Sequence, residues 1–201
     1  AAAKMSGSGI ARYCREAGVE ILQFPPERAA GATSQKAQAR PPVENNANGQ
    51  SFIEWIRAEK IDLVVSVSAS QIFGKRVLAA PMIGCVNLHN APLPKYRGML
   101  PNFRQMYHGE TESVLTIHEM VPKLDGGDVL LQYRTAIERD MSLERLMTVT
   151  KENSATALWS FLEVLQRGEA TARPLSGEGS YFSWPTRKEA REFRRRGRRV
   201  W

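Results

Sequence analysis

The stretch GCVNLH at residues 84–89 is an apolar run that carries two polar side chains, Asn87 and His89. A short run of this kind predicts a buried strand over 83–89. Side chains two residues apart in a strand point to the same face, so Asn87 and His89 project together. In open parallel sheets, ligands bind at the carboxyl ends of the strands, which is where both residues lie. The stretch therefore predicts both a strand of a sheet and the edge of a binding site.

Helix and strand patterns alternate on either side of this strand. Predicted helices cover 8–17, 51–60, 101–108 and 142–167, and further predicted strands cover 19–24, 63–69, 114–120 and 129–137. Ser51 is a candidate cap for the second of these helices. Alternation of this kind indicates an α/β fold with a mainly parallel sheet and helices on both faces.

Two segments stand apart from this alternation. Residues 27–50 are rich in Ala, Gln, Asn, Gly and Pro and have almost no large apolar side chain, which predicts a mobile loop. Residues 169–201 are irregular up to Thr186, a suitable cap for the basic helix predicted after it. We therefore expect a catalytic domain over 1–168 and an irregular C-terminal segment over 169–201.

Charge is unevenly distributed along the chain. Its 201 residues include 28 Lys and Arg against 21 Asp and Glu, a formal net charge of +7. Residues 187–201 contain eight basic and two acidic side chains, so the rest of the chain is nearly neutral. The basicity that would indicate a nucleic-acid-binding protein is thus confined to one tail.

Several function classes are excluded by composition. Two cysteines, Cys14 and Cys85, are too few for a disulfide scaffold or a four-cysteine zinc site. Three histidines leave little room for a metal cluster, and we expect no metal cofactor. No stretch approaches the roughly 20 apolar residues that cross a bilayer, and the first residues lack the apolar core of a signal peptide. The sequence predicts a cytoplasmic protein without a membrane partner.

An amide, an imidazole and a carboxylate in one pocket would suit acyl transfer. Asn87 can donate to a developing oxyanion, and His89 can take or give a proton near pH 7. A downstream carboxylate, Asp125, can orient the imidazole and stabilise its charged form. No serine or cysteine is placed as an obvious nucleophile, so direct attack by a substrate amine is the simpler scheme.

Three motifs in this order resemble those of the folate-dependent formyltransferases: NxH at 87–89, LPxYRG at 93–98 and LDxGD at 124–128. This family includes methionyl-tRNA, glycinamide ribonucleotide and nucleotide-sugar formyltransferases. The resemblance covers about residues 10–165 and implies a Rossmann-like formyltransferase domain. Compared with the family, the chain is expected to lack the first strand–helix–strand unit and the larger C-terminal module that acts on tRNA.

The resemblance also implies roles for individual residues. The formyl donor is 10-formyltetrahydrofolate, Asn87 holds the oxyanion, His89 moves protons and Asp125 pairs with His89. The implied folate-binding residues are Ser70, Gln71, Ile72, Phe73, Val121 and Leu124. Those on the acceptor side are Lys95, Tyr96 and Arg97, although Lys95 and Arg97 could equally be solvated or paired locally.

The resulting prediction is an N-formyltransferase that acts on a small primary amine, in particular a nucleotide-linked amino sugar, and that could form a homodimer. Three alternatives stay open: formylation of methionyl-tRNA aided by the basic tail, hydrolysis of formyltetrahydrofolate, and a non-catalytic folate- or nucleotide-binding module. His118 is interpreted as a packing or surface residue. Trp184 is interpreted as packing within an irregular segment, although its ring could stack on a base or sugar.

Overall fold

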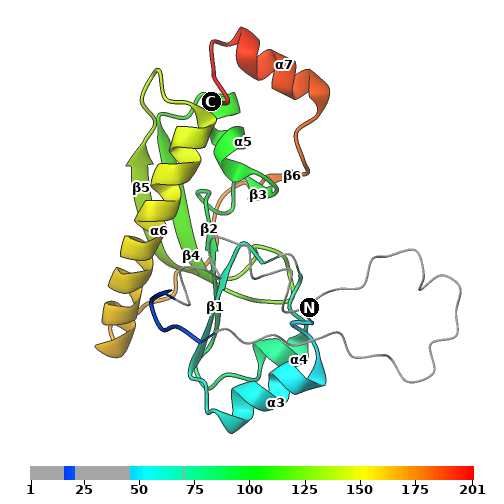
Figure 1. Ribbon diagram of the computed structural model, residues 1–201, viewed down its shortest axis with the longest axis vertical. Coiled ribbons are helices and arrows are strands. Elements are labelled where there is room, and N and C mark those ends of the chain that lie inside the picture. The colour runs from blue at the N-terminus through cyan, green and yellow to red at the C-terminus, as the bar shows by residue number, and fades with distance from the viewer. Residues whose placement is uncertain (1–15, 21–45, 70) are drawn as a thin grey trace, which may run out of the picture.

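Four strands form the central sheet, in the order β1-β2-β4-β5 (Figure 1). β1 (Leu63–Val67) lies parallel to β2 (Gly84–His89). β4 (Glu112–Glu119) is antiparallel to β2, and β5 (Val129–Ala136) is antiparallel to β4. The α/β class is confirmed, and the β1–β2 pair is the parallel part of the described sheet.

This computed structural model describes residues 16–20, 46–69 and 71–201. The predictions at 8–17, 19–24 and 27–50, and that of a missing first unit, therefore lie wholly or largely outside the described residues. The other predicted elements are present with boundaries shifted by a few residues. No helix in the described part of the chain is long and apolar enough to cross a membrane.

Helices cover both faces of the sheet. α6 (Leu143–Gln166) packs on one face, where Ala157 and Phe161 contact an apolar layer from the strands. α3 (Gln50–Ala58) and α4 (Lys75–Leu78) pack on the other face, beside β1 (Figure 1). The residues of the first layer are Val86, Leu88, Leu115 and Ile117, and those of the second include Ile53, Ile56, Phe73 and Val77. The prediction of helices on both faces is confirmed.

Side chains along β2 and β4 point alternately to the two faces of the sheet, which separates the apolar core residues from the polar residues of the site. Val86 and Leu88 of β2 point into the layer under α6, so Asn87 and His89 point to the opposite face. Strand pairing sets Asn87 opposite His118 and His89 opposite Thr116 of β4. The polar side chains of two adjacent strands therefore share the face that α6 does not cover.

Helix ends follow the signals in the sequence with one exception. Ser142 accepts a hydrogen bond from the Arg145 amide and caps α6 as expected for a serine at this position. α5 (Pro101–His108) begins on a proline and ends at Gly109, which has a φ of 82°. The expected cap of α3 is wrong: Gly49 occupies the N-cap and Ser51 lies inside the helix.

The C-terminal segment packs back on the body of the protein. β6 (Tyr181–Phe182) pairs in parallel with β3 (Arg97–Gly98) in a second, two-stranded sheet. α7 (Arg187–Arg195) follows and inserts the fully buried Phe193 into a core cluster that also contains residues of α5 and α6. Figure 1 shows α7 beside α5, so the segment covers the end of the molecule near the C-terminus.

Candidate active site

Asn87, His89, His118 and Asp125 form one polar cluster, in which the two histidines and Asp125 are buried and Asn87 is half-buried. One carboxylate oxygen of Asp125, Oδ1, lies 3.8 Å from His89 Nδ1 and 3.8 Å from His118 Nε2. Asn87 Nδ2 lies 3.2 Å from His118 Nε2. The predicted catalytic residues Asn87, His89 and Asp125 are thus brought together, although 36 positions separate His89 from Asp125 in the sequence.

Asp125 is held by the loop between β4 and β5. Its backbone has a φ of 47°, and its Oδ2 accepts a hydrogen bond of 3.1 Å from the Gly98 amide. Two residues later the chain passes so close to β4 that a Cβ on Gly127 would stand 2.0 Å from the carbonyl oxygen of Glu119. Only glycine permits this approach, which explains why the LDxGD motif has a glycine at position 127.

The orientation of His89 is set by the loop at 93–98. His89 Nε2 lies 3.0 Å from the carbonyl oxygen of Tyr96, and a carbonyl can only accept, so Nε2 carries the proton. In the neutral ring, Nδ1 then carries the lone pair and faces Asp125. His89 can therefore accept a proton at Nδ1, next to a carboxylate that stabilises the resulting charge.

His118 belongs to the same cluster, and its interpretation as a packing or surface residue misses this contact. Its Nδ1 lies 2.7 Å from the backbone carbonyl of Glu119 and donates to it, so Nε2 is free to accept from Asn87 Nδ2. Burial lowers the pKa of His118 below its ordinary value of 6.5. The signal in the sequence is only its place on the polar face of a strand, and strand pairing decides which residue it opposes.

An open cavity of about 450 Å³ lies over this cluster. One wall is formed by residues expected to bind folate, namely Gln71, Ile72, Phe73, Val121 and Leu124. Ser70 lies outside the described residues. Trp184 of the C-terminal segment also lines the cavity, with 61% of its surface exposed, so the expectation that it packs within an irregular segment does not describe its position.

Lys95, Tyr96 and Arg97, expected on the acceptor side, do not line this cavity. Tyr96 is buried, and its hydroxyl donates a 2.7 Å hydrogen bond to Glu110. Burial and the adjacent Glu110 carboxylate raise the pKa of Tyr96 above its usual range. Lys95 lines a separate hollow of about 390 Å³. The contribution of this loop to the site is made by backbone: the Tyr96 carbonyl orients His89, and the Gly98 amide holds Asp125.

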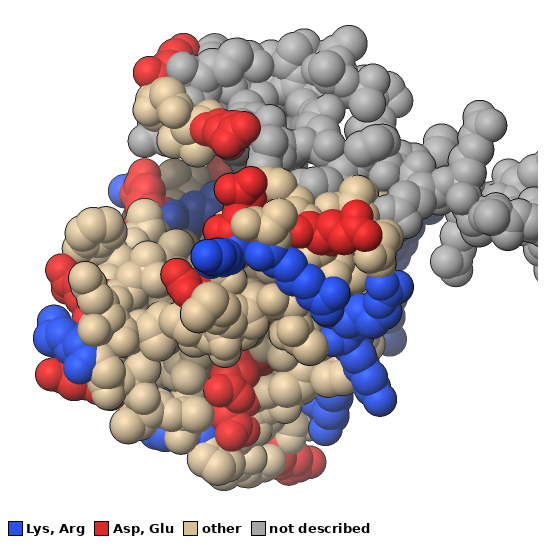
Figure 2. All heavy atoms as spheres, turned by 90° about the horizontal axis from the view of Figure 1, so that it is seen from below, with Lys and Arg blue, Asp and Glu red and all other residues tan. Residues whose placement is uncertain are grey.

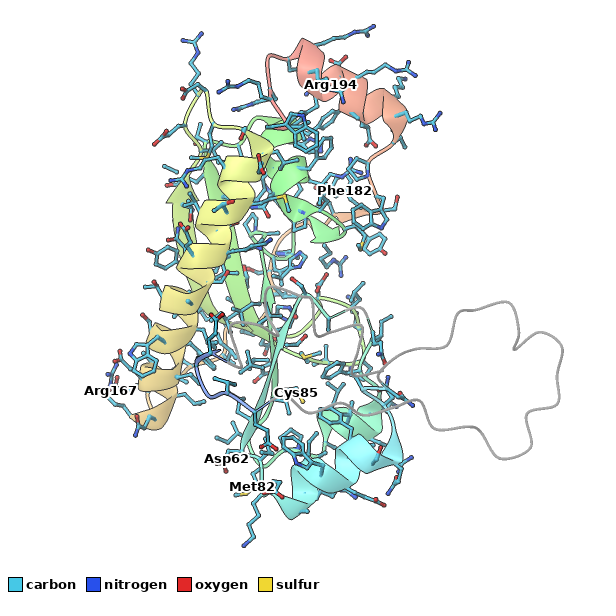
Figure 3. The ribbon with its side chains drawn as sticks, in the orientation of Figure 1. Asp62, Met82, Cys85, Arg167, Phe182 and Arg194 are labelled. Carbon is cyan, nitrogen blue, oxygen red and sulfur yellow. The ribbon has the colours of Figure 1, made fainter. Side chains whose placement is uncertain are left out.

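Cys85 does not supply a nucleophile to the cluster. It lies two residues before Asn87 on β2 (Figure 3). Its Sγ contacts α4, at 3.8 Å from the carbonyl oxygen of Val77. Burial raises the pKa of the Cys85 thiol to about 11, so it stays protonated near neutral pH. The described residues contain no group of three or more His, Cys, Asp or Glu side chains that could hold a metal ion.

Residues 7–162 match the model of the formyl transferase family, so the chain belongs to this family. The methionyl-tRNA formyltransferase of Thermotoga maritima is 35% identical over 121 residues, which are 60% of this chain and 39% of that protein. The methionyl-tRNA formyltransferase of Paraburkholderia xenovorans is 32% identical over 181 residues, which are 90% of this chain and 52% of that protein. The chain thus spans about half the length, or less, of the curated relatives it matches.

Solved structures show the same fold at lower identity. A sugar N-formyltransferase from a Shewanella species has a TM-score of 0.61 at 20% identity, over 73% of this chain and 64% of that one. A formyltransferase from Anoxybacillus kamchatkensis has a TM-score of 0.58 at 16% identity, over 87% of this chain and 79% of that one. That second structure contains UDP-4,6-dideoxy-4-formamido-L-AltNAc and tetrahydrofolate.

Proposed function

We propose that this chain transfers a formyl group from 10-formyltetrahydrofolate to a primary amine. The observation that carries the proposal is the convergence of Asn87, His89 and Asp125 beside one cavity, in a chain that belongs to the formyl transferase family. These three side chains supply a hydrogen-bond donor, a proton carrier and a fixed negative charge. Acyl transfer to an amine is accelerated by oxyanion stabilisation and by proton transfer, and the fixed charge supports the proton carrier.

Each residue then has a defined step. The amine nitrogen attacks the formyl carbon, and an N–H of Asn87 donates to the oxygen on which negative charge develops. His89 Nδ1 takes the proton that the amine nitrogen loses and delivers it to the folate nitrogen as its bond to carbon breaks. Asp125, 3.8 Å from Nδ1, stabilises the charged imidazole between these events. The products are a formamide and tetrahydrofolate.

The cavity has walls that fit a folate. Ile72 is 65% exposed and Leu124 43% exposed, and both line the cavity. Large apolar side chains left open to solvent are suited to a flat heterocycle, while convergent polar groups fix its reacting atom. The solved relative that contains tetrahydrofolate supports this assignment.

A nucleotide-linked amino sugar is the acceptor that we propose. Trp184 lines the cavity and is 61% exposed, so its indole is accessible for stacking on a base or sugar ring. The relative from Anoxybacillus kamchatkensis, which contains a UDP-linked formamido sugar, supports this class of acceptor.

Methionyl-tRNA is the second candidate acceptor, because the curated relatives named above are methionyl-tRNA formyltransferases. Basic side chains of the C-terminal tail could contact RNA phosphates. They are carried by α7 and the residues after it, and Arg194 lies at the end of the molecule opposite Met82 (Figure 3). Acidic and basic side chains both occur on the face seen from below, which is the end near Met82 (Figure 2).

The test is formyl transfer by the purified chain with 10-formyltetrahydrofolate and a panel of acceptors: UDP- and dTDP-linked amino sugars and methionyl-tRNA. Release of tetrahydrofolate and the mass of the formylated product are measured. We expect turnover with an amino sugar, and a loss of at least 100-fold in His89→Asn and Asp125→Asn. Asp140→Asn, which changes an exposed carboxylate, should keep full activity.

Two results would contradict the proposal: no tetrahydrofolate release with any acceptor, or unchanged turnover in both active-site variants. If methionyl-tRNA is the better acceptor, the second candidate replaces the first. In that case, Arg194→Glu with Arg198→Glu should weaken tRNA binding and reduce its salt dependence. These charge reversals are preferable to deletion of the tail, because deletion would also remove the buried Phe193.

A further inference from the structure

We propose that His118 is a positioning residue for the Asn87 side-chain amide. One N–H of that amide donates to the His118 ring, and the second N–H is left free to face the cavity. The inference rests on the proposed function, because it gives Asn87 the task of binding the oxyanion. No role is assigned to His118 by the family motifs at 87–89, 93–98 and 124–128.

Strand pairing brings the two side chains together. Asn87 and His118 are directly opposite each other in the antiparallel pair of β2 and β4. Side chains so paired share one face of the sheet, and here Asn87 Nδ2 and His118 Nε2 are 3.2 Å apart. Both strands are central in the described sheet, so pairing on both sides holds the backbone that carries the two side chains in register.

Hydrogen bonding determines the direction of this contact. The Glu119 carbonyl accepts from His118 Nδ1 at 2.7 Å, so the neutral ring presents a lone pair at Nε2. An amide rotated by 180° would bring its oxygen against that lone pair, and two facing acceptors in a buried site are destabilising. The Asn87 nitrogen is therefore the atom turned to His118, and one of its two hydrogens stays available for the cavity that Asn87 lines.

The arrangement requires His118 to be neutral. His118 is 3% exposed, and burial lowers its pKa. The charged or titratable groups placed against it are Asp125, from the loop after β4, and His89, from β2. A protonated His118 would donate from Nε2, which would compete with His89 for Asp125 Oδ1 and reverse the contact with Asn87.

Two substitutions separate positioning from packing. His118→Met keeps the volume of the side chain but removes the nitrogen acceptor, whereas His118→Gln keeps an acceptor oxygen on a chain of similar reach. We expect His118→Met to lower kcat about 10- to 100-fold, with the KM for the formyl donor within about threefold. This loss is smaller than the roughly 100- to 1,000-fold effect of removing an oxyanion donor, because the Asn87 amide is misoriented but still present. In His118→Gln, the decrease in log kcat should be at most half of the decrease seen in His118→Met.

A double-mutant cycle with Asn87→Ala tests whether the two residues act as a unit. In the Asn87→Ala background, His118→Met should cause less than a twofold further loss of kcat. Thr116→Val is the matched control, because Thr116 lies on the same strand and face and donates to the Ala91 carbonyl rather than to Asn87. That variant should keep kcat within about threefold, although it loses a buried hydrogen bond.

Nitrogen NMR of the unliganded protein provides a readout that does not depend on activity. At pH 7, His118 should show a protonated Nδ1 and an unprotonated Nε2, and the side-chain NH2 signals of Asn87 should shift in His118→Met. A protonated Nε2, or losses of kcat that multiply in the double variant, would overturn the inference. Absence of any formyl transfer by the wild-type chain would instead refute the proposed function, and NMR would still decide the orientation of the amide.

Discussion

At the scale of single residues, the site depends on close approaches of backbone that only particular side chains permit. Gly126 and Gly127 are adjacent in the loop that holds Asp125, yet a Cβ would meet different atoms at the two positions. At Gly127 it would stand 2.0 Å from a backbone carbonyl, whereas at Gly126 it would stand 2.8 Å from the flexible side chain of Lys123. A side chain can move aside, but the backbone of β4 cannot.

Gly127→Ala should therefore lower the free energy of unfolding by about 1–3 kcal/mol, as expected for overpacking, and should reduce formyl transfer by displacing Asp125. Gly126→Ala is the control, and we expect a change within about 1 kcal/mol with activity retained. Urea denaturation and turnover of both variants check this prediction. Equal effects at the two positions would show that the contact with Glu119 does not limit the loop.

His118 also gives a pH dependence of stability with a defined sign. The imidazole has an ordinary pKa of 6.5, and burial lowers the pKa in the folded protein. As pH falls below about 6.5, the unfolded chain takes up a proton that the folded chain does not, so acid favours unfolding. This loss of stability is absent above pH 7 and grows as the pH falls toward 5.

Urea denaturation between pH 5 and pH 8 should show that His118→Gln loses less stability than wild type as the pH is lowered. The comparison is between the two slopes, because other groups common to both proteins also titrate in this range. Parallel slopes would mean that His118 takes up protons equally in the folded and unfolded states.

At the scale of elements, α7 is held by a buried arginine and a helix cap that share one carboxylate. Glu189 caps the backbone of Thr186 at the start of the helix and also accepts a hydrogen bond from Arg104 of α5. Arg104 is 2% exposed, and its second terminal nitrogen donates to the Ser183 carbonyl. The hydrogen bond from Arg104 lowers the pKa of Glu189 from 4.5 to about 2.

Glu189→Gln should destabilise the protein by about 1–3 kcal/mol, because it leaves the buried Arg104 without its charged partner. Glu192→Gln, on the same helix, removes only surface pairs with Arg195 and Arg196 and should cost less than about 1 kcal/mol. In wild type, the contribution of Glu189 is fully present above pH 4.5 and is lost as pH falls toward 2. Denaturation and hydrogen exchange of α7 measure both effects.

At the scale of the whole molecule, the C-terminal segment takes part in the candidate site. β6 pairs with β3, which begins directly after Tyr96, the residue whose carbonyl orients His89. Two residues after β6, Trp184 lines the cavity. The division into 1–168 and 169–201 remains a prediction, but the cavity wall contains residues from both parts.

Trp184→Ala should raise the KM for a nucleotide-linked amino sugar about 10-fold and leave the KM for 10-formyltetrahydrofolate within about twofold, because it removes the ring on which we propose that the acceptor stacks. Trp159→Ala is the matched control, since Trp159 is 67% exposed on α6 and does not line the cavity. Steady-state kinetics with each substrate varied in turn check this. An unchanged acceptor KM would exclude a role of the indole in binding.

The sequence by itself determined the local elements and the chemical types at the site. The period-2 pattern of 84–89, the helical pattern of 142–167 and the cap at Thr186 predict structure because they act between neighbours in the chain. The tertiary structure alone decided that His118 stands opposite Asn87 and that the loop at 93–98 contributes carbonyl and amide groups rather than Lys95 and Arg97 side chains. Strand register and loop packing depend on contacts between distant segments, and such contacts leave no local pattern in the sequence.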